Sequence, residues 1–397
     1  MADINHLFPN AEQLDTMNAL LAIIAANREG GLEVSSWKSI AQIVKMGLAP
    51  RAFPVGSEFT TENSDESTNV LWVVRGHNKH AAANKNFKQT MTLEVKNVYG
   101  NSAGTYKGVV FDATEALYYA PSGLAAGTYH FTLLSGYDTT YGGGKTLMFT
   151  LKQPLPSGGQ IVFPWAYQTQ ATATKISTYP SADSTQAIES GITVTEGADG
   201  SLLGTADGNT ENMNHTHRIR YGSNNYAQSA VRQWLNSKAA AGSVWKPTNK
   251  FDRAPSWATT YNGFMHGLPS EFLEVVQPAV IPCRTNSIYE VASLDGTEFT
   301  KDQTYNLEDK FFLLSRPEIY GSWDNASYKD GELLPYYDGL TNAEKIKRDA
   351  AGAARNCWLR SPYPGTASSA RIVYTDGSLS SSNANYAFAV APACIIA

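Results

Sequence analysis

The C-terminal stretch Asn356–Ala397, NCWLRSPYPGTASSARIVYTDGSLSSSNANYAFAVAPACIIA, interleaves two kinds of residue. One kind is expected to form a buried framework: Trp358, Leu359, Pro362, Val373, Leu379, Val390, Pro392 and Ile395. The other kind is expected to face solvent: Tyr363, Thr366, Ser368, Ser369, Ile372, Tyr374, Ser380, Ser381, Ser382, Asn383, Asn385, Tyr386 and Phe388. Tyrosine offers a large amphipathic contact area at low entropic cost, while serine and asparagine offer adaptable hydrogen bonds. This second set is typical of a binding surface, and the rest of the chain is interpreted as its scaffold.

A hairpin is predicted inside this stretch. Asp376-Gly377 separates the strand-like run 371–375 from a second run that starts at Ser378, and Asp-Gly between two such runs is a strong hairpin signal. Alternation along a strand places Ile372 and Tyr374 on one face and Val373 on the other. With Val373 in the core, we expect Ile372 and Tyr374 to point outward.

Length and composition limit the possible classes of protein. A chain of 397 residues predicts two or three domains, and a hydrophobic content of 42% is enough for packed cores. The net charge of −5, without a basic stripe, argues against a nucleic-acid partner and against an anionic membrane. The 3 cysteines are too few for a disulfide scaffold and are expected to be reduced and buried.

The N-terminal sequence MADINHLFPNAEQ lacks a basic start followed by an apolar run. We therefore expect no signal peptide, and no later run is apolar enough to predict membrane insertion. Synthesis is expected in a bacterial cytoplasm, with release as part of an assembly or by lysis.

Residues 1–49 are predicted to be a helical attachment or oligomerisation segment. Leu14, Met17, Leu21 and Ile24 form a narrow apolar seam of coiled-coil type, which is equally compatible with a short helix packed on its own domain. A second helix is predicted from about Ser36.

Residues 51–164 are predicted to be a β-rich module, in the form of a sandwich or barrel. Its expected strands are 70–74, 91–95, 108–111, 128–133 and 146–151. Gly144-Lys145-Thr146 looks like the end of a phosphate-binding loop, but Thr139 stands where the first glycine is required, so nucleotide binding is rejected.

Residues 165–397 are predicted to be the third unit, with a polar connection at 165–220. Its expected elements are helices over 225–236, 269–276 and 341–355 and a buried strand over 310–314. Thr341 and Glu344 have the spacing of a capping box.

Four runs carry a resemblance to a known family: 225–236 (NYAQSAVRQWLN), 309–315 (DKFFLLS), 357–362 (CWLRSP) and 390–393 (VAPA). Together they resemble the C-type-lectin-like variable proteins of diversity-generating retroelements, many of which are phage or prophage proteins. The resemblance covers roughly residues 221–397. It implies an α+β chain whose C-type-lectin-like domain, over 165–397, ends in a variable region at about 356–397.

In that family a reverse transcriptase copies a template with errors at adenines, and the copy replaces the end of the gene. AAC codons diversified in this way never yield Lys, Glu, Gln, Met or Trp. None of those residue types occurs from Ser361 to Ala397. Cys357 is interpreted as a further variable position beside Trp358.

The function implied is that of a non-enzymatic receptor-binding protein located in the virion, associated with a tail fibre, and without a cofactor. Its expected partners are a host cell-surface protein or glycan, other virion proteins through the N-terminus, and further copies of itself, with a trimer expected. The expected anchors are Tyr363, Tyr374, Tyr386 and Phe388.

Other functions are weighed against this one. A virion decoration protein without a receptor remains an alternative, as does an oxidase of the formylglycine-generating type, although the cysteines lack a neighbouring base in sequence. His215 and His217 resemble metal ligands, but no third ligand has a suitable spacing, so no metal is predicted.

Overall fold

The computed structural model describes residues 36–66, 69–100, 107–112, 125, 222–246, 254–285, 303–364 and 369–397, together with the backbone of five further strands between residues 117 and 196. The predicted seam at Leu14–Ile24, most of the connection at 165–220, and His215 and His217 lie outside the described residues.

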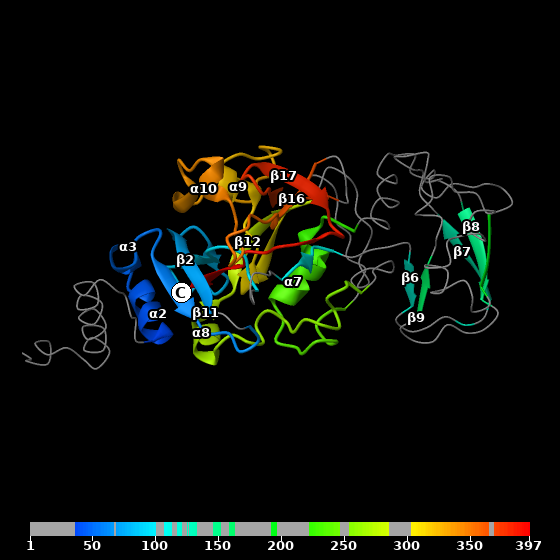
Figure 1. Ribbon diagram of the computed structural model, residues 1–397, viewed down its shortest axis with the longest axis horizontal. Helices are drawn as coiled ribbons and strands as arrows, with labels where there is room; N and C mark the ends of the chain where they lie inside the picture. The colour runs from blue at the N-terminus through cyan, green and yellow to red at the C-terminus, as the bar shows by residue number, and fades with distance from the viewer. Residues whose placement is uncertain are drawn as a thin grey trace, which may run out of the picture.

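The largest sheet has the strand order β1-β2-β4-β19-β11, and β14 also pairs with β19. Its strands are β1 (Glu58–Thr61), β2 (Val70–His77), β4 (Met91–Val95), β11 (Val276–Gln277), β14 (Phe311–Phe312) and β19 (Ala393–Ile396). All of these pairs are antiparallel. The last strand of the chain thus lies inside the sheet, and Figure 1 shows the C-terminus beside β2 and β11.

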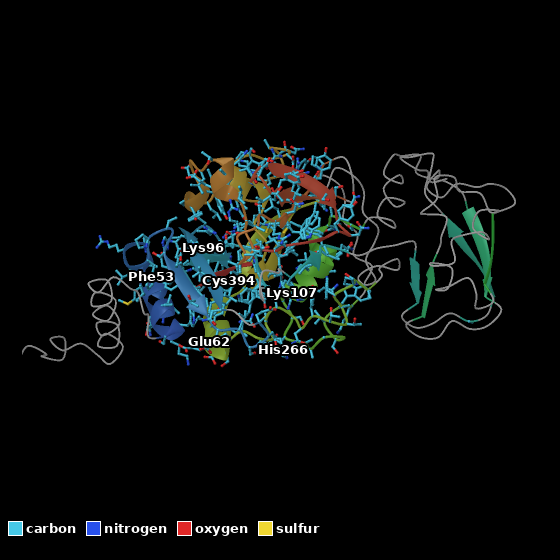
Figure 2. The ribbon with its side chains drawn as sticks, viewed as in Figure 1. Phe53, Glu62, Lys96, Lys107, His266 and Cys394 are labelled. Carbon is cyan, nitrogen blue, oxygen red and sulfur yellow. The ribbon has the colours of Figure 1, made fainter. Side chains whose placement is uncertain are left out.

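This sheet crosses the domain boundary that was expected near residue 165. Strands β1, β2 and β4 come from the segment predicted to be a separate β-rich module, yet β4 pairs directly with β19. Leu93, opposite Cys394, is fully buried in the shared core. The β4–β19 pair therefore joins the described parts of 51–112 and 222–397, called the main body below, in one sheet with a shared core. Figure 2 places Cys394 among the packed side chains of this body.

Smaller antiparallel sheets complete the strand structure. Three lie within the main body: β13-β12-β3, β15-β16-β17 and β18-β5. Their bounds are β3 (Ala81–Ala82), β5 (Val109–Val110), β12 (Ala279–Arg284), β13 (Thr304–Asp309), β15 (Cys357–Pro362), β16 (Ser369–Val373), β17 (Leu379–Asn383) and β18 (Ala387–Phe388). Two more sheets are formed by β6 (Leu117–Ala120) with β9 (Gly159–Val162) and by β7 (Gly127–Thr132), β8 (Thr146–Leu151) and β10 (Ile192–Glu196). Figure 1 shows these two apart from the main body.

The described helices are short: α2 (Trp37–Lys45), α3 (Ala49–Ala52), α7 (Ala230–Leu235), α8 (Ser270–Val275), α9 (Arg316–Tyr320) and α10 (Asn342–Lys345), with 3-10 turns η6 (Tyr226–Gln228) and η7 (Pro335–Tyr337). The structure is thus mixed α and β, with mostly strands, few helices and a curled antiparallel sheet, which agrees with the expected α+β class. None of these helices is both long and apolar enough to cross a bilayer.

The predicted helix from about Ser36 is confirmed as α2. The Ser36 side chain accepts a hydrogen bond from the backbone N–H of Ser39 and caps the first turn. Ile40 and Val44 are buried, and Gly47 takes the left-handed conformation that ends the helix. The strands predicted over 70–74, 91–95 and 146–151 and the helix over 269–276 are also present, as β2, β4, β8 and α8.

The long helix predicted over 341–355 is wrong. The capping box of Thr341 and Glu344 forms, but α10 ends at Lys345. The Asp349 side chain then accepts a hydrogen bond from the N–H of Ala353, and Gly352 adopts a φ of 82°, which closes a turn. Lys347 points inward to the buried Glu94, at 2.9 Å. A helix would not allow this ion pair together with the turn, so tertiary contacts override the local preference.

A buried ionic network links β15, in the sheet β15-β16-β17, to β4 of the main sheet. Arg360 in β15 donates two hydrogen bonds to Glu318 in α9, and Glu318 lies 3.0 Å from Nε2 of His80. The other ring nitrogen of His80 lies 3.0 Å from the hydroxyl of Thr92 in β4. Each of these side chains is almost wholly buried. Because a buried charge is stable only when it is paired, the network fixes how β15, α9 and β4 sit together.

We expect acid to weaken this network. Burial alone would raise the pKa of Glu318, but the positive charge of Arg360, with His80, outweighs it and lowers the pKa from 4.5 to about 2. A carboxyl group with a lowered pKa contributes stability above its unfolded pKa and loses it as the pH falls through the folded pKa. The free energy of unfolding should therefore fall by on the order of 3 kcal/mol between about pH 5 and pH 2, as measured by urea denaturation.

The matched control replaces an exposed carboxyl group. Glu318→Gln should remove this part of the pH dependence while lowering stability overall, whereas Glu344→Gln, on the surface of α10, should keep it. An identical acid slope in Glu318→Gln and the unmodified protein would contradict the assignment.

Candidate ligand-binding face

The last part of the chain forms the sheet β15-β16-β17, and the predicted hairpin joins two of its strands. Arg371 pairs with Ser381 and Ser369 pairs with Asn383 across β16 and β17. Gly377 closes the turn with a φ of 80°, and a side chain there would collide with the carbonyl oxygen of Asn342. The Asp-Gly signal is thus confirmed, and the glycine is required both by the turn and by the close approach of α10.

Aromatic side chains pack around Trp358, which lies in β15 of this sheet. The indole N–H of Trp358 donates to the carbonyl of Val109 at 2.9 Å. The Trp358 ring packs on Phe111 and on Phe388, with centroids 5.5 and 4.9 Å apart. Strand β18, which carries Phe388, pairs in turn with β5. Residues 107–112, far away in sequence, therefore hold the C-terminal loop in place (Figure 1).

Ten of the predicted surface residues are at least partly accessible. Tyr374 and Tyr386 are exposed, at 44% and 50%. The partly accessible ones are Tyr363, Ser369, Ser380, Ser381, Ser382, Asn383, Asn385 and Phe388. These ten residues are called the display face below. Thr366 and Ser368, also predicted to be on the surface, lie outside the described residues.

Two predicted surface residues are buried instead. Ile372 is 2% exposed and Cys357 is 1% exposed. The prediction for Ile372 assumed that β16 buries one face only, but Val373 on the opposite face is also fully buried, so both faces of the strand are covered there. Cys357 pairs with Val373 and bridges to Ala389, and so belongs to the framework. Neither residue is available to a ligand.

The display face has two ends, separated by the length of β16. Tyr374 lies at the hairpin end, where its N–H donates to the carbonyl of Ser378 at 2.8 Å. At the other end, the N–H of Tyr363 donates to the carbonyl of Ser369, and the hydroxyl of Ser369 donates to Asn383 at 3.2 Å. Tyr386 follows, with its ring centroid 5.9 Å from that of Phe388.

A charged cluster adjoins the Tyr363 end, and the sequence patterns missed it. The guanidinium of Arg371 lies 4.6 Å from the centroid of the Tyr363 ring. It donates from Nε to Asp324 at 3.0 Å and also from Nη2. Arg316 donates to the same carboxylate. Asp324 lies in a loop after α9, 47 residues before Arg371, so no local spacing could have signalled the contact.

Asn224 holds the ends of the segment that joins β15 and β16. Its side-chain amide donates to the carbonyl of Ser369 at 2.8 Å and to that of Tyr363 at 3.3 Å. It belongs to a fully buried run with Ser223 and Asn225, just before η6. Asn224 thus binds the backbone carbonyls of Tyr363 and Ser369. The side chains of these two residues remain partly accessible.

The three cysteines are all buried. Burial raises the pKa of Cys283 and of Cys357 to about 12, and it raises that of Cys394 well above its ordinary value. A thiol is a nucleophile mainly as its thiolate, so these environments favour the unreactive form. Within the described part of the chain, no three His, Cys, Asp or Glu side chains come together as a metal site.

Comparison with known proteins identifies one family. Residues 199–397, half of the chain, match a family described as a domain of unknown function, DUF6273. The chain belongs to this family. The DUF6273 region contains α7 to α10 and β11 to β19, and with them the whole display face, whereas β1, β2 and β4 of the main sheet precede it. No curated protein and no solved structure matches the chain.

Framework and display positions should respond differently to the same substitution. Ile372→Asn places an amide in a buried site and should lower the free energy of unfolding by about 2–5 kcal/mol. Ser381→Asn, on the neighbouring strand, should change it by no more than about 0.5 kcal/mol. Urea denaturation of both variants measures the difference. Equal destabilisation would show that the display face is not a separate, tolerant layer.

Proposed function

We propose that this protein is a non-enzymatic ligand-binding display protein, which acts as a receptor-binding protein on a phage or prophage tail fibre. In this proposal the DUF6273 region is a C-type-lectin-like domain, and a diversity-generating retroelement varies its C-terminal end. The observation that carries the proposal is the separation within residues 357–397 of a buried framework from an accessible face of Tyr, Ser and Asn. The sequence resemblance described above supplies the class of protein.

The energetics of such a surface support this role. Substitution at accessible positions away from caps and networks changes stability by only about 0.5 kcal/mol, so many side chains are tolerated there. Burial of aromatic anchors dominates the free energy of binding in many interfaces. Tyr374 and Tyr386 are the most exposed aromatic side chains of the display face and are the proposed anchors.

The variable positions proposed here are the ten residues of the display face, together with Thr366 and Ser368, which lie outside the described residues. Cys357 and Ile372 are excluded because they are buried, and changes there would cost framework packing. The N-terminal segment, residues 1–49, is proposed to dock on another virion protein. Several copies of the chain, as in a trimer, would raise avidity where each contact is weak.

Loss of the exposed aromatic anchors should reduce attachment to host cells. Tyr386→Ala and Tyr374→Ala remove side chains that are half exposed, so the fold should be retained while binding to whole cells falls at least tenfold. Met46→Ala, at an equally exposed residue at the end of α2, is the matched control and should bind normally. Adsorption of the purified protein to host cells measures the effect.

If neither tyrosine variant changes adsorption, the display face is not the receptor site. Failure of the unmodified protein to adsorb to any candidate host would instead favour a virion decoration protein without a receptor. The two outcomes can be told apart because the second is measured on the unmodified protein, without any substitution.

Diversification makes a separate, genetic prediction. Gene copies from one lineage should differ mainly at adenine-derived positions in the codons of the display face, such as Ser380, Ser382 and Tyr386. Codons 357 and 372 should stay constant, because Cys357 and Ile372 are buried. Deep sequencing of the 3′ end of the gene tests this expectation. Differences spread evenly over buried and accessible codons would contradict it.

A further inference from the structure

We propose that the ligand of the display face is a saccharide that carries a carboxylate, and that this carboxylate docks on Arg371 beside Tyr363. The inference rests on the proposed function and specifies the class of ligand that the same face takes. It starts from the charge of the cluster formed by Arg316, Asp324 and Arg371, which lies at the Tyr363 end of the face.

Positive charge exceeds negative charge in this cluster. Arg316 and Arg371 both donate to the one carboxylate of Asp324. Of the charged groups packed next to them, Arg360 is paired with Glu318, and Arg284 and Asp330 have opposite charges, both acting on Arg316. Among the described residues, the cluster therefore has two guanidinium groups on one shared carboxylate.

Hydrogen-bond donors exceed acceptors in the same place. Nε of Arg316 and Nη2 of Arg284 are buried and have no acceptor among the described residues. Arg371 uses Nε and Nη2 on Asp324, and none of the described residues accepts from its Nη1. Guanidinium groups match the planar, two-oxygen geometry of a carboxylate, and such charge-assisted bonds are about twice as strong as neutral ones. The cluster is thus suited to an additional anionic group.

The side chains around Arg371 suit a sugar. Ser369 lies on the same face of β16, and their cross-strand partners are Asn383 and Ser381. Cross-strand neighbours lie about 5 Å apart and same-face neighbours along a strand about 7 Å apart, so these four positions span roughly one sugar ring. The hydroxyl and amide groups match sugar hydroxyls, and the Tyr363 ring lies against the Arg371 guanidinium that would bind the carboxylate.

A protein ligand fits this face less well. Protein interfaces have an apolar, desolvated centre, rich in aromatic residues, with a polar rim. Here the described residues between Tyr374 and Tyr386 that are accessible are mainly serine and asparagine, and those two tyrosines stand at opposite ends of the face. Polar groups in the centre and a charge surplus at one end favour an acidic saccharide.

Calorimetric titration of the full chain tests the proposal. The probes are sialyllactose, trigalacturonic acid and a hyaluronan hexasaccharide, each beside its methyl ester, which has the same shape without the charge. At least one of the acids should bind, with its ester roughly tenfold weaker, and added salt should weaken the binding.

Substitutions that remove a positive or a negative charge from the cluster should change the affinity in opposite directions. Arg371→Gln and Arg316→Gln each remove one positive charge and should weaken binding of the acid roughly tenfold. Asp324→Asn removes the negative charge and should strengthen binding, an effect that misfolding would not imitate. Arg355→Gln breaks another arginine–aspartate pair, with Asp349, in the segment before β15, and should leave affinity within about twofold. Circular dichroism verifies that each variant is folded.

Two results would overturn the proposal. One is that the acids and their esters bind equally well. The other is that none of the acids binds. If the protein nevertheless adsorbs to host cells through Tyr374 or Tyr386, the display function stands and only the ligand class is wrong. If adsorption is also absent, the display function fails as well.

Discussion

The ion pair between Arg360 and Glu318 determines how the C-terminal sheet is attached to the rest of the molecule. Arg360 sits in β15, immediately before the display segments, and Glu318 sits in α9. Through His80 and Thr92 the same network reaches β4 of the main sheet. Arg360 also donates to the carbonyl oxygens of Pro282, Leu313 and Asp330, so its donors are used on four separate segments. This hub therefore adds to the pairing of β15 with β16 and to the Trp358–Val109 hydrogen bond in positioning the strand under the display face.

The sheet β15-β16-β17 contains both buried side chains, which hold its shape, and accessible side chains. Trp358, Ala370 and Val373 are buried and hold the shape of the sheet. The serine and asparagine residues of β17 are partly accessible. The turn at Gly377 and the backbone pairing of β16 with β17 set the register of the hairpin, to which the Ser369–Asn383 hydrogen bond adds. The accessible side chains can therefore change without a change of fold.

Sequence patterns predicted those elements whose signals are local. The capped helix α2, the β-branched strands β2 and β4, and the Asp-Gly hairpin all follow from neighbouring residues and were found. The capping box at Thr341 was also found, but the helix after it ends after one turn because Lys347 pairs with Glu94, more than 250 residues away. The prediction that Ile372 points outward was wrong, because alternation along a strand does not tell whether both of its faces are buried. The cluster around Asp324 depends entirely on tertiary contacts, and no periodicity encodes it.

The place of β19 has a consequence for polypeptides that are incomplete at their C-terminal end. This strand follows the display face along the chain and pairs on one side with β4 and on the other with β11 and β14. A polypeptide that ends early, or whose reading frame shifts within the preceding forty or so residues, would leave three strand edges unsatisfied and a core open to water. Cellular proteases act on such chains. Because β19 completes the sheet, only chains whose last forty or so residues are intact yield a stable product.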